Sequence, residues 1–195
     1  MLVRHRGAVG GPDSDAILVQ RARAGDATAS AELFRRHASR ITALLVRLLG
    51  SHADAEDAAQ ETFVHALRDL HQLRDPRALS QWLTQLAVSQ AHRRFRRRRL
   101  LAALGFEASP RDGTLDQIAD PKASADVRAE LALLDQALGE LRASQRMAWM
   151  LRYVEGYRLA EVARLCGCSL ATTKRRLSAA SARVAQHIAI EVDDE

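Results

Sequence analysis

Hydrophobic residues recur every three or four positions along most of the chain, and this spacing is typical of the buried face of an α-helix. In the first half, the pattern predicts a short helix over residues 13–24 and a long helix over residues 28–49, which a glycine ends. A third helix is expected over residues 51–70, and a fourth begins at about residue 77 and continues into a run of arginines. The inward residues expected of the two middle helices are Phe34, Ile41, Leu44, Leu45, Leu48, Leu49, Ala59, Phe63, Ala66, Leu67 and Leu70.

The helical pattern stops between residues 105 and 123, where three turn-forming dipeptides follow one another. A loop of about 20 residues is unusual inside a compact domain, so this stretch is predicted to be a flexible linker. Four more helices are expected after it, at about 124–141, 143–155, 158–166 and 169–190. The predicted fold class is therefore all-α, with two small helical domains at residues 13–104 and 124–190.

The composition supports a helical protein. Of 195 residues, 4% are aromatic, 10 are glycine and 4 are proline, which disfavours a sandwich or barrel. No apolar run reaches the ~18 residues of a membrane span, and the first residues lack the apolar segment of a signal peptide. The two cysteines are one residue apart and cannot form a disulfide framework. We expect a soluble cytoplasmic protein with no membrane insertion.

Charge is strongly segregated along the chain. The 29 basic and 24 acidic residues give a net charge of +5 and a pI of about 10.0, and all but two of the basic residues are arginine. Acidic residues gather within 54–61, arginines gather within 93–99, and residues 162–190 contain basic residues but no acid. A chain that only needed solubility would mix the signs. The blocks therefore predict three different surfaces and a polyanionic partner.

Residues 158–177 predict a helix-turn-helix. Gly167 permits the left-handed backbone of the turn, and Ser169 can accept a hydrogen bond from the first amides of the second helix. The basic outer side of this helix suits the major groove of DNA, with an ordinary helical hairpin as the alternative. The residues expected to face inward are Val162, Ala163, Cys166, Leu170, Thr173 and Leu177. Those expected to face outward and bind DNA are Thr172, Lys174, Arg175 and Arg176.

Cys166 and Cys168 stand where this motif needs small apolar side chains. A metal site would need further ligands at close spacing, and the nearest histidine, His187, is about 20 residues away. Packing is therefore favoured over metal binding.

Carboxylates share one face of the third predicted helix at Asp54, Asp57 and Glu61, with Gln60 beside them. Paired carboxylates can bind a metal or act as acid and base, but the Glu-x-x-His pattern of di-iron bundles is absent. A solvated face and a docking surface for a basic partner protein are the two interpretations that the residues leave open. The sequence predicts no catalytic group, metal, cofactor or small-molecule substrate.

The fourth predicted helix carries a polar stripe that leads into the arginine run. Such a run can be a solvated end, a patch for anionic membranes or a nucleic-acid-binding surface. Because no apolar face of the membrane-binding type accompanies it, nucleic acid is favoured. The residues expected to contact nucleic acid are Gln85, Ser89, His92, Arg93, Arg96 and Arg97.

Taken together, these features resemble the extracytoplasmic-function (ECF) sigma factors of the bacterial sigma-70 family. The matching stretches are AELFRRH at residues 31–37, ADAEDAAQETFVHAL at residues 53–67, Trp82-Leu83 with the arginine run, and LRYVEGY at residues 151–157 before the helix-turn-helix. The acidic string is the most specific of them.

The resemblance implies a non-enzymatic promoter-specificity subunit in a bacterial cytoplasm. The segment matching residues 71–97 would melt and read the promoter −10 element, and the helix matching residues 169–183 would read the −35 element. The second domain would also pack on the flap of the polymerase β subunit, and an anti-sigma factor is a further implied partner. The contacts to the coiled coil of the polymerase β′ subunit would be Asp54, Asp57, Gln60 and Glu61.

The predicted function is therefore that of an RNA polymerase sigma factor that directs core polymerase to specific promoters. One alternative is a stand-alone helix-turn-helix repressor or activator. Another is a degenerate sigma-like module that binds protein without reading DNA. The acidic stretch 54–61 distinguishes a sigma factor from the first alternative, because a stand-alone repressor has no need of it.

Overall fold

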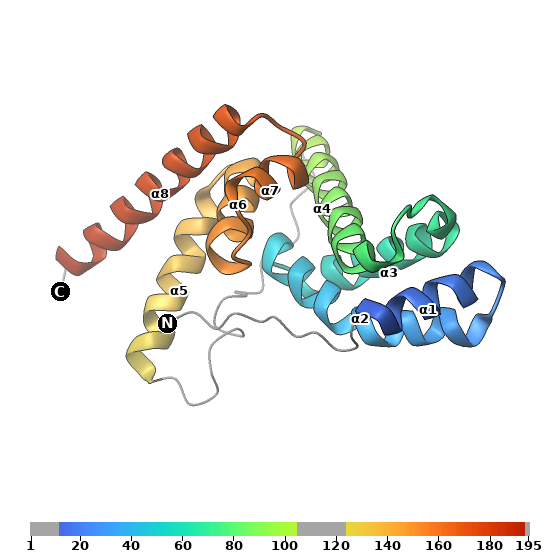
Figure 1. Cartoon of the computed structure of the whole chain (residues 1–195). Coiled ribbons are helices and arrows are strands. Elements are labelled where there is room, and N and C mark those ends of the chain that lie inside the picture. Colours follow the sequence, from blue (N-terminus) through green and yellow to red (C-terminus); the bar gives the residue numbers. More distant parts are fainter. Residues whose placement is uncertain (1–11, 105–123, 194–195) are drawn as a thin grey trace. The chain divides into compact units, whose positions relative to one another are not determined.

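The computed structural model describes residues 12–104 and 124–193, with side chains described for residues 15–104 and 124–186. All the regular elements in these ranges are helical (Figure 1), which confirms the predicted fold class. The described residues fall into two compact units, one on each side of the predicted linker, which itself lies outside the described residues. The N-terminal unit contains α1 (Pro12–Arg23), α2 (Ala27–Leu49), α3 (His52–Arg68), η1 (Leu70–Gln72), η2 (Pro76–Ala78) and α4 (Leu79–Ala103). The C-terminal unit contains α5 (Ala125–Glu140), α6 (Ala143–Trp149), the π-helical η4 (Met150–Val154), α7 (Leu159–Leu165) and α8 (Leu170–Asp193).

Helix α2 is the centre of the N-terminal unit and packs against α1, α3 and α4. Its buried stripe includes Ile41, Leu45 and Leu48, which have no exposed surface. Gly50 ends the helix at φ 70°, a left-handed conformation that favours glycine, and its N–H donates to the Val46 carbonyl at 2.8 Å. The predicted end of this helix is confirmed.

Helix α1 is fixed to α2 through a buried polar pair. The His37 Nε2 and Asp15 Oδ2 atoms are 2.9 Å apart, and each residue is 6% exposed. Burial lowers the pKa of His37, while the neighbouring Asp15 carboxylate opposes this shift. The imidazole is therefore held in its neutral form at neutral pH.

Two residues predicted to face the core of the N-terminal unit are instead exposed. Phe34 on α2 is 48% exposed and Leu67 on α3 is 46% exposed. In each case the preceding residue, Leu33 or Ala66, takes the inward position, and the next residue points about 100° away around the helix.

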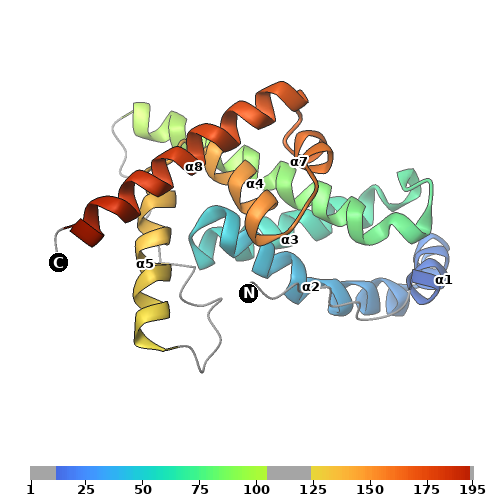
Figure 2. The same cartoon turned by 60° about the vertical axis from the view of Figure 1, so that its left-hand side comes forward.

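In the C-terminal unit, α8 packs against α5, α6 and α7 (Figure 2). The core contains Leu138, Met147 and Leu151, none of which has exposed surface. Arg146 is 1% exposed and lies 3.6 Å from Asp135, so this buried cation is matched by an acid on α5. Helix α8 adds the buried residues Leu177, Ala180 and Val184 to this core.

Candidate protein- and nucleic-acid-binding surfaces

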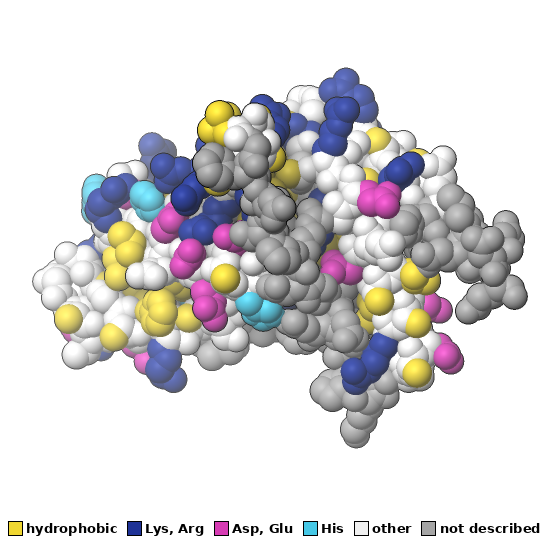
Figure 3. Space-filling model, turned by 180° about the vertical axis from the view of Figure 1, so that it is seen from behind, with side chains coloured by type: hydrophobic (Ala, Val, Ile, Leu, Met, Phe, Trp, Pro, Cys, Tyr) yellow, Lys and Arg dark blue, Asp and Glu magenta, His cyan; other side chains and the backbone are white. Residues whose placement is uncertain are grey.

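The acidic residues of α3 face the arginines of α4. Arg94 NH1 lies 3.3 Å from Asp54 Oδ1 and 3.4 Å from Asp57 Oδ2, and its NH2 lies 3.1 Å from Glu61 Oε1. Arg98 also pairs with Asp54 and donates to the Leu49 carbonyl at 3.4 Å. Acidic and basic side chains lie side by side on one face of the molecule (Figure 3).

This contact corrects the prediction that the acidic and arginine blocks form separate surfaces. The Arg94 and Arg98 side chains are only 13% and 19% exposed, whereas those of Asp57 and Glu61 are 69% and 52% exposed. The two arginines therefore serve the contact between α3 and α4, while the carboxylates of Asp57 and Glu61 stay open to solvent beside the exposed Arg97. The paired residues are 33 to 44 positions apart in the chain, so no local pattern reveals them.

An apolar hollow of about 430 Å³ lies on α2 and α3 beside the acidic face. Its lining includes Phe34, Phe63, Val64 and Leu67, and the rings of Phe34 and Phe63 pack edge to face at 4.7 Å. Val64 is 59% exposed. Val64 and Gln60 also border a second, more polar hollow, which Asp57 and Glu61 line.

The two hollows share Gln60 and Val64 and thus make one continuous surface, apolar on one side and charged on the other, where Arg94 and Arg97 lie beside the carboxylates of Asp57 and Glu61. Sequence reasoning missed the apolar side, because it assigned Phe34 and Leu67 to the core. No local signal separates them from adjacent apolar pairs in which both residues are buried, such as Leu44-Leu45 and Leu48-Leu49 on α2.

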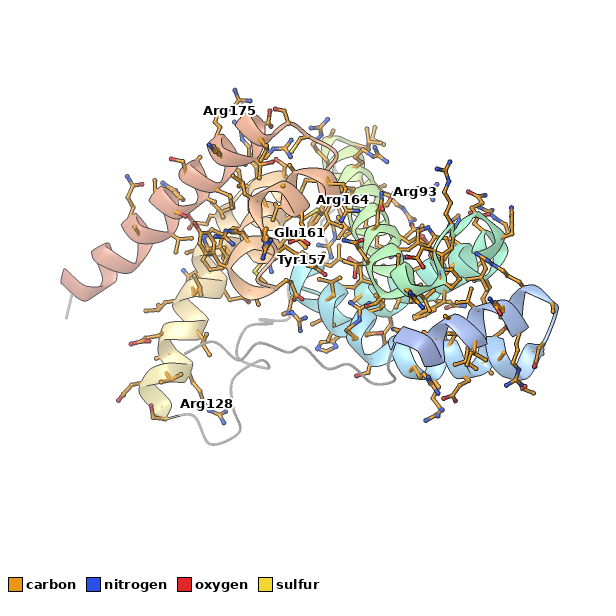
Figure 4. The ribbon with its side chains drawn as sticks, in the orientation of Figure 1. Arg93, Arg128, Tyr157, Glu161, Arg164 and Arg175 are labelled. Atoms are coloured by element: carbon orange, nitrogen blue, oxygen red, sulfur yellow. The ribbon has the colours of Figure 1, made fainter. Side chains whose placement is uncertain are left out.

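The polar stripe predicted on the fourth helix lies on α4. Gln85, Ser89, Arg93 and Arg96 are exposed, as is Arg97, and His92 is half-buried. Figure 4 labels Arg93 on this helix. The structure therefore brings the predicted nucleic-acid-binding residues together on one helix, apart from the paired Arg94 and Arg98.

The segment between α3 and α4 is held by a side chain from α1. Arg23 Nε and NH2 both donate to the Leu70 carbonyl at 3.2 Å, and NH2 also donates to the Leu73 carbonyl. Asp75 accepts a hydrogen bond from the Arg77 amide at 3.0 Å and so caps η2. The resemblance placed promoter −10 contacts in this segment, and Arg23 is a residue that sequence reasoning missed.

The helix-turn-helix has the predicted local geometry. Gly167 has φ +60°, and the Ser169 hydroxyl accepts a hydrogen bond from the Thr172 amide at 3.1 Å. The predicted inward residues Val162, Ala163, Cys166, Thr173 and Leu177 are buried. Leu170 is 49% exposed, contrary to the prediction, because it occupies the first position of α8, where the helix emerges from the turn.

The four residues predicted to face outward from α8 are not equivalent. Lys174 and Arg175 are exposed, and Arg175 lies on the outer side of α8 in Figure 4. Arg176 is half-buried and donates to Cys168 Sγ at 3.4 Å. Thr172 is half-buried beside the helix cap and accepts a hydrogen bond from the Ser169 hydroxyl. The open positive charge at the start of α8 therefore belongs to Lys174 and Arg175.

Cys166 packs as a small hydrophobic side chain, as predicted. Burial raises the pKa of its thiol to about 11, so the thiol stays protonated at neutral pH. Cys168 is half-buried and its Sγ lies 3.3 Å from Thr173 Oγ1. Within residues 15–104 and 124–186, whose side chains are described, no group of three or more His, Cys, Asp or Glu side chains is arranged to hold a metal ion. No helix in these ranges combines the length and the apolar character needed to cross a membrane.

Two family models match the chain: Sigma-70 region 2 over residues 33–100, and Sigma-70, region 4 over residues 131–184. The chain is 32% identical over 174 residues to the ECF RNA polymerase sigma factor SigM of Mycobacterium tuberculosis, covering 89% of this chain and 84% of that protein. It is 31% identical over 172 residues to the RNA polymerase sigma-H factor of Pseudomonas aeruginosa, covering 85% of this chain and 89% of that protein.

Solved structures share the fold. CnrH, in complex with the cytosolic domain of CnrY, matches with a TM-score of 0.59 and 23% identity, over 90% of this chain and 97% of CnrH. The sigma factor RpoE of Bartonella quintana, in complex with the anti-sigma factor NepR, also matches with a TM-score of 0.59 and 23% identity, over 82% and 96% of the two chains.

Proposed function

The chain belongs to the ECF RNA polymerase sigma factors of the sigma-70 family, and from this membership we propose how its two units divide their tasks. As an RNA polymerase sigma factor, it directs core polymerase to promoters for transcription initiation. The N-terminal unit docks on core polymerase and binds the −10 element. The C-terminal unit binds the −35 element and the β flap.

The observation that carries this proposal is the surface that joins acidic and apolar residues on α2 and α3. Asp57 and Glu61 present exposed carboxylates, and Val64 and Leu67 present exposed apolar side chains next to them. A basic helix with apolar residues would match both halves of this surface, and the β′ coiled coil is the element we assign to it. Gln60 borders both hollows and completes the contact. A stand-alone repressor has no use for such a surface.

Asp54 has a different task from its acidic neighbours. Its side chain is 23% exposed and pairs with both Arg94 and Arg98. A carboxylate that already pairs with two cations has few free acceptor positions for a partner protein. We therefore assign Asp54 to the contact between α3 and α4, and Asp57, Gln60 and Glu61 to the polymerase.

Promoter DNA is assigned to the exposed polar stripe of α4 and to the start of α8. Lys174 and Arg175 sit within the first two turns of the second helix of the helix-turn-helix, the part that reaches base edges in the major groove. Arg93, Arg96 and Arg97 supply positive charge for the −10 region. The holoenzyme would act in the bacterial cytoplasm, and an anti-sigma partner stays a prediction from the family resemblance.

Reconstitution with core polymerase tests the proposal. The wild-type chain should support promoter-specific transcription only with core, and should bind promoter DNA weakly when alone. The double variant Asp57→Asn with Glu61→Gln should bind core at least about tenfold more weakly, because it removes two charges from the contact. A control of equal charge change is Asp126→Asn with Glu130→Gln on α5, which should bind core like the wild type.

Tight, specific DNA binding by the free chain, with no effect of core, would favour the repressor alternative. Unchanged core binding by the Asp57 and Glu61 double variant would show that the polymerase docks elsewhere. Binding to core without promoter-specific initiation would favour the degenerate sigma-like module.

A further inference from the structure

Arg94 belongs to the arginine run, but its guanidinium forms ion pairs with acidic residues of α3. Its side chain is 13% exposed, and its guanidinium spans three carboxylates of α3, those of Asp54, Asp57 and Glu61. The three ion-pair distances lie between 3.1 and 3.4 Å. A group so enclosed is poorly placed to bind phosphate or bases.

The contacts leave Asp57 and Glu61 accessible. Arg94 reaches Asp57 through Oδ2 and Glu61 through Oε1, while more than half of each side chain is exposed. The guanidinium therefore lies behind the carboxylates as seen from solvent and holds each of them from one side. It also screens the repulsion among three like charges within two turns of one helix.

We infer that Arg94 is a positioning residue of the polymerase-docking surface: it holds the carboxylates of Asp57 and Glu61 in the geometry that a cationic partner binds. The inference rests on the docking role proposed above for these two residues. Side chains that are free in the unbound protein lose rotamer freedom when a partner orders them, and that loss weakens binding. Arg94 orders them in advance.

Arginine suits this task better than lysine. Its planar guanidinium carries several N–H donors in fixed directions, so one side chain can serve three carboxylates at once. A lysine ammonium keeps the charge but is a compact point at the end of a flexible stem. The two substitutions Arg94→Lys and Arg94→Gln therefore separate geometry from charge.

The test measures the affinity and dissociation rate of the full chain with core polymerase. We expect Arg94→Gln to raise the Kd on the order of tenfold, mainly through faster dissociation, because the carboxylates of Asp57 and Glu61 must then be ordered on binding. Arg94→Lys should recover only part of this loss. Wild-type affinity in both variants, or tighter binding by either, would overturn the inference, since Arg94 would then be neutral or would compete with the partner.

Two controls separate positioning from a general effect on folding. Arg98→Gln removes the other arginine of the same helix contact, and should lower the melting temperature while leaving the affinity for core near wild type. Arg94→Gln added to Asp57→Asn with Glu61→Gln should have almost no further effect on the Kd, because the side chains that it positions have already lost their charge. A further tenfold loss in that background would show that Arg94 acts through the fold and would overturn the inference.

The same measurements distinguish this inference from the proposed function. If Asp57→Asn with Glu61→Gln binds core like the wild type, the docking surface itself is misassigned. If that variant is impaired and Arg94→Gln is not, the docking surface stands and only the positioning role of Arg94 fails.

Discussion

Both units contain basic residues that bind the protein itself and basic residues that are open to solvent, and the contact between α3 and α4 and the start of α8 show the difference most clearly. In the N-terminal unit, several arginines are tied to the protein itself: Arg94 and Arg98 pair with acids of α3, and Arg23 binds two backbone carbonyls. In the C-terminal unit, Lys174 and Arg175 are exposed in a stretch, residues 162–190, that contains no acid. An arginine is therefore available to bind DNA only where it is not already paired with groups of the protein. A run of arginines in the sequence does not show which of them are paired.

The largest effect is expected at the open cations of α8. Adjacent helical positions point about 100° apart, so Lys174 and Arg175 cannot face the same group. We expect Arg175→Ala to cost about 1–3 kcal/mol and to relax preference at one −35 position, because arginine can read a base edge with two hydrogen bonds. Lys174→Ala should weaken all promoters alike and lower the salt slope by about one, as expected for a phosphate contact.

These measurements need the reconstituted holoenzyme and a −35 substitution series at several salt concentrations. Arg183→Ala is the matched control, because this residue of α8 is paired with Glu140 at 3.2 Å. Wild-type promoter use by both variants at every salt concentration would mean that this helix does not read DNA, and the contrast with the paired arginines of α4 would disappear.

A second effect is expected where Arg23 holds the segment between α3 and α4. Arg23→Ala removes charge-assisted hydrogen bonds to the Leu70 and Leu73 carbonyls. We expect slower promoter opening and a weaker preference at the −10 element, with unchanged affinity for core. Arg21→Ala, on the same helix, should leave both properties unchanged, because Arg21 contacts Asp26 and Thr28 instead. Equal defects in the two variants would point to a general effect on α1.

The contrast also predicts opposite outcomes within α4. Arg98→Ala should lower the free energy of unfolding by about 1–2 kcal/mol, because it breaks a largely covered ion pair with Asp54. Arg93→Ala should leave stability unchanged and weaken promoter binding, because its side chain is exposed. Chemical denaturation measures stability, and promoter binding by the holoenzyme measures DNA contact. If Arg93→Ala lowered stability and Arg98→Ala weakened only promoter binding, the distinction between paired and exposed arginines would be refuted.

The smallest effect is expected from pH. Burial lowers the pKa of His37 below its ordinary value of 6.5. When the pH falls below 6.5, the unfolded chain therefore binds a proton at His37 before the folded chain does. The free energy of unfolding should therefore be at its full value above pH 6.5 and should fall as the pH drops below 6.5. The charged groups around the imidazole are Asp15, Arg36 and Arg40. Melting temperatures of the wild type and His37→Gln on both sides of 6.5 test this, and equal pH dependence in the two proteins would exclude His37 as the source.

Local sequence was sufficient for the order and approximate bounds of the helices and for the helix-turn-helix, although the helix expected at 143–155 is α6 followed by the π-helical η4. The cap at Ser169 and the left-handed glycines at 50 and 167 depend only on neighbouring residues, so they could be predicted without tertiary information. The sharing of one face by Asp57 and Glu61 follows from helix geometry alone.

The tertiary structure alone decided which charged and apolar residues are free to bind. Arg94 and Arg98 meet acids 33 to 44 positions away, so their pairing depends on how α3 packs against α4. Phe34 and Leu67 were predicted to be buried because they continue an apolar pattern, yet their neighbours fill the core and leave them on the surface. Periodicity shows which residues can face inward, but the space between packed helices determines which of them do, and the remainder forms the surface that meets a partner.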